Sequence, residues 1–242
     1  MSDLTEEQYE MIRESEEEGN LLLEAVTFGY RGEVEDLLDM GVDVNYFGET
    51  SAINTAVENG DGRMVNLLLK RGADPNTTDM SGETPIFQAI WNGHDTILKR
   101  LLESGADINI TNPEGWKPIH LAVCTKDRNI LRQMIEKTKK INEKGPQGNT
   151  VLHTCAVEGN ASIAKILIDA GADINIRNQK GETPFMRAVS YGNYKVAETL
   201  IKAGADTAAG NSTGDTPLSL LSEMFSETQD KDCEKILKML QK

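Results

Sequence analysis

The 242-residue sequence predicts an all-α repeat solenoid, and two observations carry that prediction. A glycine recurs every 33 residues, at Gly82, Gly115, Gly148, Gly181 and Gly214. The same order of segments also returns about seven times: a turn, a short apolar helix, a second helix and a Gly-Ala-Asp-x-Asn stretch. Because each unit of such an array buries its apolar face only against its neighbours, the pattern favours an extended binding surface over an enclosed catalytic pocket.

The residues that flank these segments predict where the helices begin and end. A threonine precedes four of the first helices, namely Thr84, Thr150, Thr183 and Thr216. Its hydroxyl can accept a hydrogen bond from a free amide of the first turn, and in three cases a proline follows at the first helical position. The second helices repeat apolar residues at helical spacing, as at Ile97, Leu98 and Leu101, so neighbouring helices must cover that face. Closing glycines such as Gly105 end the second helices in the left-handed conformation.

These motifs resemble the ankyrin repeat. Residues 82–86, 116–122, 150–153 and 181–185 match the Thr-Pro-Leu-His-x-Ala box of that family, and residues 72–76, 105–109 and 171–175 match its closing hairpin. The resemblance implies helix-turn-helix repeats with β-hairpin fingers. It covers residues 20–242, which we interpret as one ankyrin repeat domain of about seven repeats with irregular terminal repeats.

The acidic residues are concentrated at the start of the chain. Residues 1–49 hold fifteen aspartates and glutamates against two arginines, a balance of −13, whereas the whole chain carries −14. We expect residues 1–19 to form an acidic N-terminal helix or cap over the first repeat. It would be either a solvated cap that keeps the array soluble or a docking site for a basic partner.

The middle of the chain has the opposite charge. Residues 112–144 contain four acidic residues and eight basic ones: Lys117, Lys126, Arg128, Arg132, Lys137, Lys139, Lys140 and Lys144. A basic island beside an acidic end would orient a protein partner of basic or mixed charge. Nucleic acid is not expected as a partner, because the overall charge would repel it.

Two departures from the period mark irregular repeats. The spacing from Gly41 to Gly72 is only 31 residues, so the finger that carries Asn45, Tyr46 and Phe47 is short. The last repeat begins regularly but then predicts an inserted loop from Ser222 to Asp232. First and last units of solenoids are commonly atypical.

No motif indicates an enzyme. His120 and Cys124, and His153 and Cys155, occupy positions typical of the repeat, without a third group at metal-ligand or catalytic spacing. We therefore expect no catalytic residue, no metal and no cofactor. The sequence has no long apolar stretch and no signal peptide, which predicts a cytoplasmic chain without a membrane span. We therefore expect its cysteines to be reduced. We also expect a monomer.

The resemblance also implies which residues bind a partner, because ankyrin repeats use hairpin tips, the residue after the first glycine and the end of the first helix. These positions hold Met80, Glu83, Trp91, Asn92, Glu114, Trp116, Thr125, Asn149, Glu158, Glu182 and Tyr191. Both tryptophans of the chain fall among them, in adjacent repeats, and we expect Trp91 and Trp116 to form one apolar anchor.

The resulting prediction is a non-enzymatic adaptor or scaffold that binds a segment of a partner protein on its concave face. One alternative is a substrate of an asparaginyl hydroxylase, modified at Asn45, Asn109 or Asn175, which fit the family's hydroxylation pattern. These asparagines could equally hold the fingers by side-chain hydrogen bonds. Another alternative is a regulatory inhibitor or microbial effector whose activity lies in its partner.

Overall fold

The structure is a computed structural model that describes residues 6–138, 140–228 and 231–240. Lys139 of the basic island and residues 1–5 of the expected cap therefore lie outside the described residues. The chain divides into two compact units, Met1–Pro113 (unit 1) and Glu114–Lys242 (unit 2). Among the described residues, no helix is long and apolar enough to cross a bilayer.

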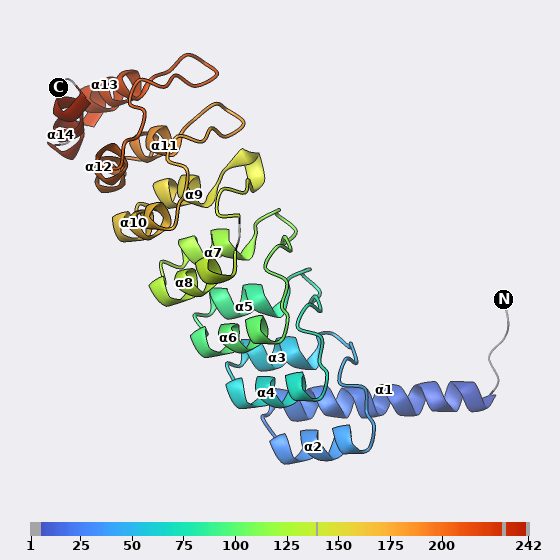
Figure 1. Cartoon of the computed structure of the whole chain (residues 1–242). Coiled ribbons are helices and arrows are strands. Elements are labelled where there is room, and N and C mark those ends of the chain that lie inside the picture. Colours follow the sequence, from blue (N-terminus) through green and yellow to red (C-terminus); the bar gives the residue numbers. More distant parts are fainter. Residues whose placement is uncertain (1–5, 139, 229–230, 241–242) are drawn as a thin grey trace. The chain divides into compact units, whose positions relative to one another are not determined.

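Unit 1 consists of three helix pairs (Figure 1). They are α1 (Glu6–Thr27) with α2 (Arg31–Asp39), α3 (Ala52–Glu58) with α4 (Gly62–Lys70), and α5 (Pro85–Trp91) with α6 (Asp95–Glu103). The first helices stack in chain order, α1 on α3 and α3 on α5. Each pair thus buries its apolar face against the next one, as the periodic glycines predicted.

Unit 2 consists of four helix pairs built in the same way. They are α7 (Pro118–Cys124) with α8 (Arg128–Lys137), α9 (Val151–Glu158) with α10 (Ala161–Asp169), α11 (Pro184–Ser190) with α12 (Tyr194–Lys202), and α13 (Pro217–Thr228) with α14 (Lys231–Leu240). A short 3₁₀ turn, η1 (Pro146–Gly148), lies in the finger before α9. The expected all-α repeat fold is confirmed in both units.

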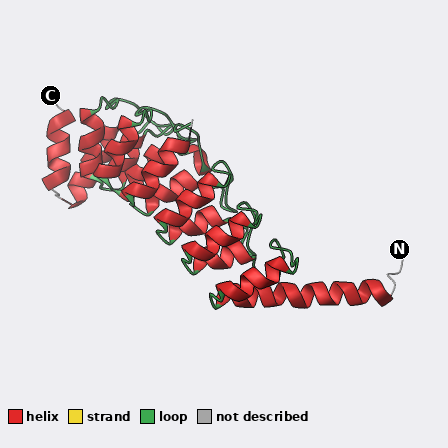
Figure 2. Ribbon diagram, turned by 60° about the horizontal axis from the view of Figure 1, so that its bottom comes forward, coloured by secondary structure: helices red, strands yellow, loops and turns green. Residues whose placement is uncertain are grey.

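The fingers are turns rather than paired strands. Figure 2 shows the longer loops gathered on one side of the helices within each unit. Within the described ranges no strand forms, and one isolated bridge joins Phe47 to Ser51. The asparagines near the finger bases connect successive fingers instead: Asn45 Nδ2 donates to Gly72 O (3.2 Å), and Asp74 N donates to Asn45 Oδ1 (2.8 Å). These bonds satisfy backbone groups that a β-ladder would otherwise pair.

The helix caps follow the sequence with one exception. Thr183 Oγ1 accepts a hydrogen bond from Met186 N (3.3 Å), and Thr150 shares a capping box with His153. Thr84 precedes α5 as predicted, but its hydroxyl makes no cap bond and is buried without a hydrogen-bond partner among the described residues. The start of α5 therefore depends on Pro85 at its first position rather than on the expected cap.

The first repeat differs from the others because its first helix is long. Helix α1 is continuous over 22 residues, so the boundary expected at residue 19 lies inside it. The short finger of this repeat packs on α1: Tyr46 Oη donates to Asn20 Oδ1 (3.2 Å). At Gly19 an added Cβ would lie 2.3 Å from the Tyr46 ring, so only glycine admits this contact.

The last repeat does not contain the expected loop from Ser222 to Asp232. Helix α13 instead continues to Thr228, and α14 begins at Lys231. Within this repeat Leu221 and Cys233 are buried, and the Cys233 thiol donates to Leu221 O (3.4 Å). The extra residues lengthen α13 because the intervening stretch, although polar, contains no proline or glycine to end the helix.

Candidate functional site

A hollow of about 310 Å³ opens among the first helices of unit 2. Its walls come from α7, α9 and α11 and from the finger that precedes α9. Helix α9 supplies the floor because His153, Thr154, Val157 and Glu158 recur one turn apart and face the same side. The hollow thus lies on the surface formed by first helices and a finger, which the resemblance assigned to partner binding.

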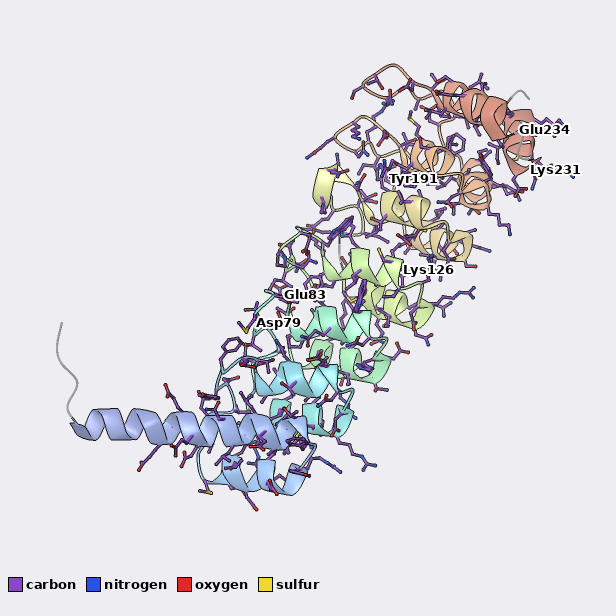
Figure 3. The ribbon with its side chains drawn as sticks, turned by 180° about the vertical axis from the view of Figure 1, so that it is seen from behind. Asp79, Glu83, Lys126, Tyr191, Lys231 and Glu234 are labelled. Atoms are coloured by element: carbon purple, nitrogen blue, oxygen red, sulfur yellow. The ribbon has the colours of Figure 1, made fainter. Side chains whose placement is uncertain are left out.

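Arg187 and Tyr191 form one wall of the hollow, and Figure 3 labels Tyr191 just after α11. They are four residues apart, and the Arg187 Cζ lies 4.8 Å from the centroid of the Tyr191 ring. Arg187 Nη1 is also 3.4 Å from Glu182 Oε2. Both of these charged side chains are only 14% exposed, whereas Tyr191 remains 53% exposed. An aromatic ring is therefore held open to solvent by a partly buried ion pair.

Hydrogen bonds tie this wall to the neighbouring repeat. Asn178 Nδ2 donates to Glu182 Oε2 (2.9 Å) and to Asn149 Oδ1 (3.0 Å). The network thus runs from the finger before α9, through the finger before α11, to Arg187 and Tyr191. Because its members are partly or fully buried and joined to one another, the wall is pre-organised for binding.

Trp116 and an exposed ion pair complete the rim. The Trp116 ring is half-buried and meets His120 edge to face, with the ring centroids 5.6 Å apart. Lys126 Nζ lies 3.6 Å from Glu158 Oε2, and Figure 3 labels Lys126 near the end of α7. An exposed pair of this kind contributes little stability, so it leaves Glu158 available to a competing cation.

Two imidazoles and one thiol in and beside the hollow are held in their neutral forms. Burial lowers the pKa of His120 and of His153 to about 4 each. Burial raises the pKa of the Cys124 thiol to about 11, and the nearby Glu158 carboxylate adds to this effect. A protonated thiol is a poor nucleophile, and an imidazole with a pKa of about 4 is a weak base and lacks its acid form near pH 7. In the part of the chain that the structure describes, no cluster of His, Cys, Asp and Glu side chains could hold a metal ion.

His153 has a structural role that is visible in its contacts. Its Nδ1 accepts from Thr150 N (3.1 Å), and its Nε2 donates to Glu182 O in the next repeat (3.0 Å). This arrangement assigns the proton to Nε2. His120 occupies the same position one repeat earlier, but Lys117 replaces the threonine there, and both ring nitrogens of His120 are buried.

The structure brings together four of the predicted binding residues around the hollow. Trp116, Asn149, Glu158 and Tyr191 line it, and Glu182 supports it through Arg187. Asn149 differs from the expectation, because it is only 7% exposed and its side chain is engaged by Asn178. It serves the network rather than an open surface. Glu114 is exposed and Thr125 half-buried, and neither lines the hollow.

The remaining predicted residues belong to unit 1. Met80, Trp91 and Asn92 are exposed, with Trp91 exposed to 68%, and Glu83 is half-buried beside Asp79 (Figure 3). Asp79 Oδ1 accepts from Glu83 N (2.9 Å), so the finger holds Glu83 in place. Trp91 ends α5 in unit 1, whereas Trp116 precedes α7 in unit 2. The expected joint anchor of the two rings stays a prediction.

Sequence reasoning missed Arg187. The signal was present, because Arg187 stands four residues before Tyr191 and five after Glu182, where helix geometry allows both contacts. Arg187 was missed because it lies in the first helix of its repeat, at a position that we interpreted as part of the helix scaffold.

The three asparagines considered for hydroxylation lie in the fingers and are exposed. Asn45 bonds to both Gly72 and Asp74, and Asn175 Oδ1 accepts from Asp206 N (2.7 Å). Asn109 N donates to Asp107 Oδ1 (2.8 Å). The side-chain contacts of Asn45 and Asn175 support a scaffold role for these two asparagines, whereas the Asn109 contact involves only its backbone.

Comparisons with known proteins agree with this architecture. The family profile described as ankyrin repeats (3 copies) matches residues 22–112, 86–178, 119–211 and 152–240. Among curated proteins, the human ankyrin repeat domain-containing protein 40 is 36% identical over 78 residues, and the mouse 2-5A-dependent ribonuclease is 37% identical over 76 residues. These matches cover 31% and 30% of this chain but only 21% and 10% of the two relatives.

Two solved structures resemble most of the chain. The ankyrin repeat domain of Bcl-3, described as a unique member of the IkappaB protein family, has a TM-score of 0.77 at 26% identity and covers 82% of this chain and 92% of its own. The human ASB11 ankyrin repeat domain has a TM-score of 0.71 at 28% identity, with coverage of 82% and 90%. Such domains are generally protein–protein interaction modules. The chain belongs to the ankyrin repeat family.

Proposed function

We propose that this chain is a non-enzymatic adaptor or scaffold that binds a segment of a partner protein in the hollow of unit 2. The observation that carries the proposal is the wall formed by Arg187 and Tyr191. A half-exposed aromatic ring fixed by a partly buried ion pair matches the anchors that dominate binding energy in protein interfaces. Trp116 supplies a second ring that lines the same hollow.

The charges around the hollow favour a segment of basic or mixed charge. Glu158 is only loosely paired with Lys126 at 3.6 Å, so a lysine or arginine from the partner can compete for it. The neutral thiol and imidazoles support recognition rather than catalysis. We also propose that the chain acts as a monomer in the cytoplasm and binds neither nucleic acid nor a cofactor.

The test is to identify the partner and map where it binds. The full chain is used as bait in affinity purification with mass spectrometry, and amide hydrogen exchange is then measured with and without the recovered partner. Protection is expected in residues 116–124, 146–158 and 187–191. Protection confined to other segments of unit 2 or to unit 1 would contradict the proposed site.

A further inference from the structure

A second hollow, of about 390 Å³, lies between α1 and α2 on the first repeat. We call it the α1/α2 groove, and it is lined by Leu21, Glu24, Ala25, Tyr30, Glu33, Asp36, Leu37 and Met40. Its apolar side chains are unusually open, since Leu21 and Tyr30 are each 53% exposed and Met40 is 73% exposed. A contiguous exposed apolar patch of this kind is typical of an interaction site.

The following repeat shows what this face is built to receive. Gly29 follows the first helix of the first repeat, and Gly60 follows the first helix of the second repeat. When these glycines are aligned, four groove residues match four residues of the second repeat. Leu21, Glu24, Glu33 and Leu37 correspond in order to Ala52, Thr55, Met64 and Leu68. All four residues of the second repeat are buried, whereas none of the four groove residues is. Positions that become buried once a repeat precedes them must face that preceding repeat. The α1/α2 groove is therefore a surface shaped to accept packed helices.

The groove carries negative charge without compensation. Its charged residues are Glu24, Glu33 and Asp36, and no ion pair joins any of them to another residue that the structure describes. Helix α1 continues the same stripe, because Glu17 and Glu14 are exposed one and two turns before Leu21, respectively. In Figure 1 this part of α1 runs past the end of α2. Residues 1–113 hold 23 acidic residues against 7 basic ones, a balance of −16.

We propose that the α1/α2 groove binds a short amphipathic helix from a partner protein, with an apolar stripe flanked by lysine or arginine. The helix form follows from the groove between two helices, where apolar side chains spaced i, i+3, i+4 and i+7 interdigitate. The basic flanks follow from the three carboxylates of the groove, which form no ion pair with the residues that the structure describes. Because α2 has nine residues, the matching helix spans about three turns. This surface goes beyond the proposed function, since it lies in unit 1 rather than in unit 2.

The probe is a fluorescein-labelled 14-residue helical peptide with leucine at i, i+3, i+4 and i+7 and lysine beside that stripe. Its affinity for the full chain is measured by fluorescence anisotropy. The variant Glu24→Gln/Glu33→Gln/Asp36→Asn should weaken binding about tenfold and flatten its salt dependence. The matched control is Glu35→Gln/Glu49→Gln/Glu58→Gln, which has the same net charge and alters exposed carboxylates of unit 1 outside the groove. It should change the affinity less than about twofold.

The apolar part is tested separately. Leu21→Ser/Met40→Gln should also weaken the peptide about tenfold while leaving the helical circular dichroism unchanged, since both side chains are exposed. A peptide of the same composition in scrambled order should bind at least about tenfold more weakly.

Four outcomes would overturn the proposal. In the first, both triple variants weaken peptide binding equally. In the second, the scrambled peptide binds as tightly as the designed one. In the third, the peptide does not bind the full chain, and in the fourth, self-association of the chain blocks peptide binding. Hydrogen exchange separates this result from the proposed function, because the peptide should protect residues 21–40. Peptide protection at residues 116–158 instead would contradict the α1/α2 groove and leave the hollow of unit 2 standing.

Discussion

The two units use one repeat to build two different surfaces. Unit 1 carries a balance of −16, with its apolar side chains open in the α1/α2 groove. Residues 114–242 hold 16 acidic and 18 basic residues, and in unit 2 the exposed ring of Tyr191 is fixed by a network that includes Arg187 and Glu182. The difference lies in the positions left free by the repeat scaffold rather than in the scaffold itself.

The largest expected effect comes from removing the last repeat of unit 2. Deleting residues 215–242 removes the buried Leu221 and Ile236 and uncovers α11 and α12, on which α13 and α14 pack. The free energy of unfolding of unit 2 should fall by roughly 3 to 6 kcal/mol, because each fully buried aliphatic side chain contributes about 1.5 to 3 kcal/mol. Urea denaturation and size-exclusion chromatography measure this loss. A truncated chain as stable and soluble as the full one would contradict the repeat boundaries.

The next effect is a greater loss of stability at acid pH in unit 2 than in unit 1. His120 and His153 are buried in unit 2, whereas the same repeat position holds Asn54 and Phe87 in unit 1. The folded pKa of each histidine is about 4, below the ordinary value of 6.5. The unfolded chain therefore binds more protons as the pH falls, so stability that is complete above pH 6.5 is lost between pH 6.5 and 4.

At pH 5 the expected loss is about 2 kcal/mol for each histidine. Hydrogen exchange is measured at pH 7 and at pH 5 and corrected for intrinsic rates. Between these two pH values, unit 2 should lose more protection than unit 1. The variant His153→Asn should reduce the acid sensitivity of unit 2. Equal loss of protection in both units would show that the histidines are not its cause.

A smaller effect should be the same in both units. Gly105 in unit 1 and Gly171 in unit 2 have φ values of +90° and +89°, and an added Cβ would meet nothing within 4 Å at either site. Valine at either position should lower stability by about 1 to 2 kcal/mol through backbone strain alone. Thermal melting of the two single variants checks this. A much larger cost at one glycine would reveal packing that its open surroundings do not show.

The smallest effect lies within the hollow. A double-mutant cycle with Arg187→Ala and Tyr191→Leu should give a coupling energy of about 0.5 to 1 kcal/mol in denaturant unfolding. Coupling close to zero would mean that the guanidinium does not hold the Tyr191 ring, and the account of a fixed wall would lose its basis.

The sequence was sufficient for the repeats because their chemistry is local. Glycines at fixed spacing, Pro85 at a helix start and the apolar spacing of Ile97, Leu98 and Leu101 each predict structure from a few neighbouring residues. The expected loop in the last repeat was wrong, because a polar stretch without proline or glycine can continue a helix that packs on the preceding repeat, as α13 does on α11.

The candidate site was less predictable because it depends on contacts between repeats. Asn149 stands at a position expected to be open, but Asn178 from the next finger covers it. Arg187 was missed because its significance depends on Glu182 and Tyr191 together. No spacing within one repeat reveals which side chains of two successive fingers meet.

The most direct test of the central claim pairs binding with melting on the same variants. Trp116→Ala and Tyr191→Ala are compared with Leu218→Ala, which changes an exposed apolar residue of unit 2 outside the hollow. The affinity for the partner recovered with the wild-type chain should fall by roughly 2 to 4 kcal/mol in the two hollow variants and stay unchanged in the control, with all three melting temperatures nearly equal. Unchanged affinity in both hollow variants, or a large loss of stability in either, would contradict a binding site in the hollow of unit 2.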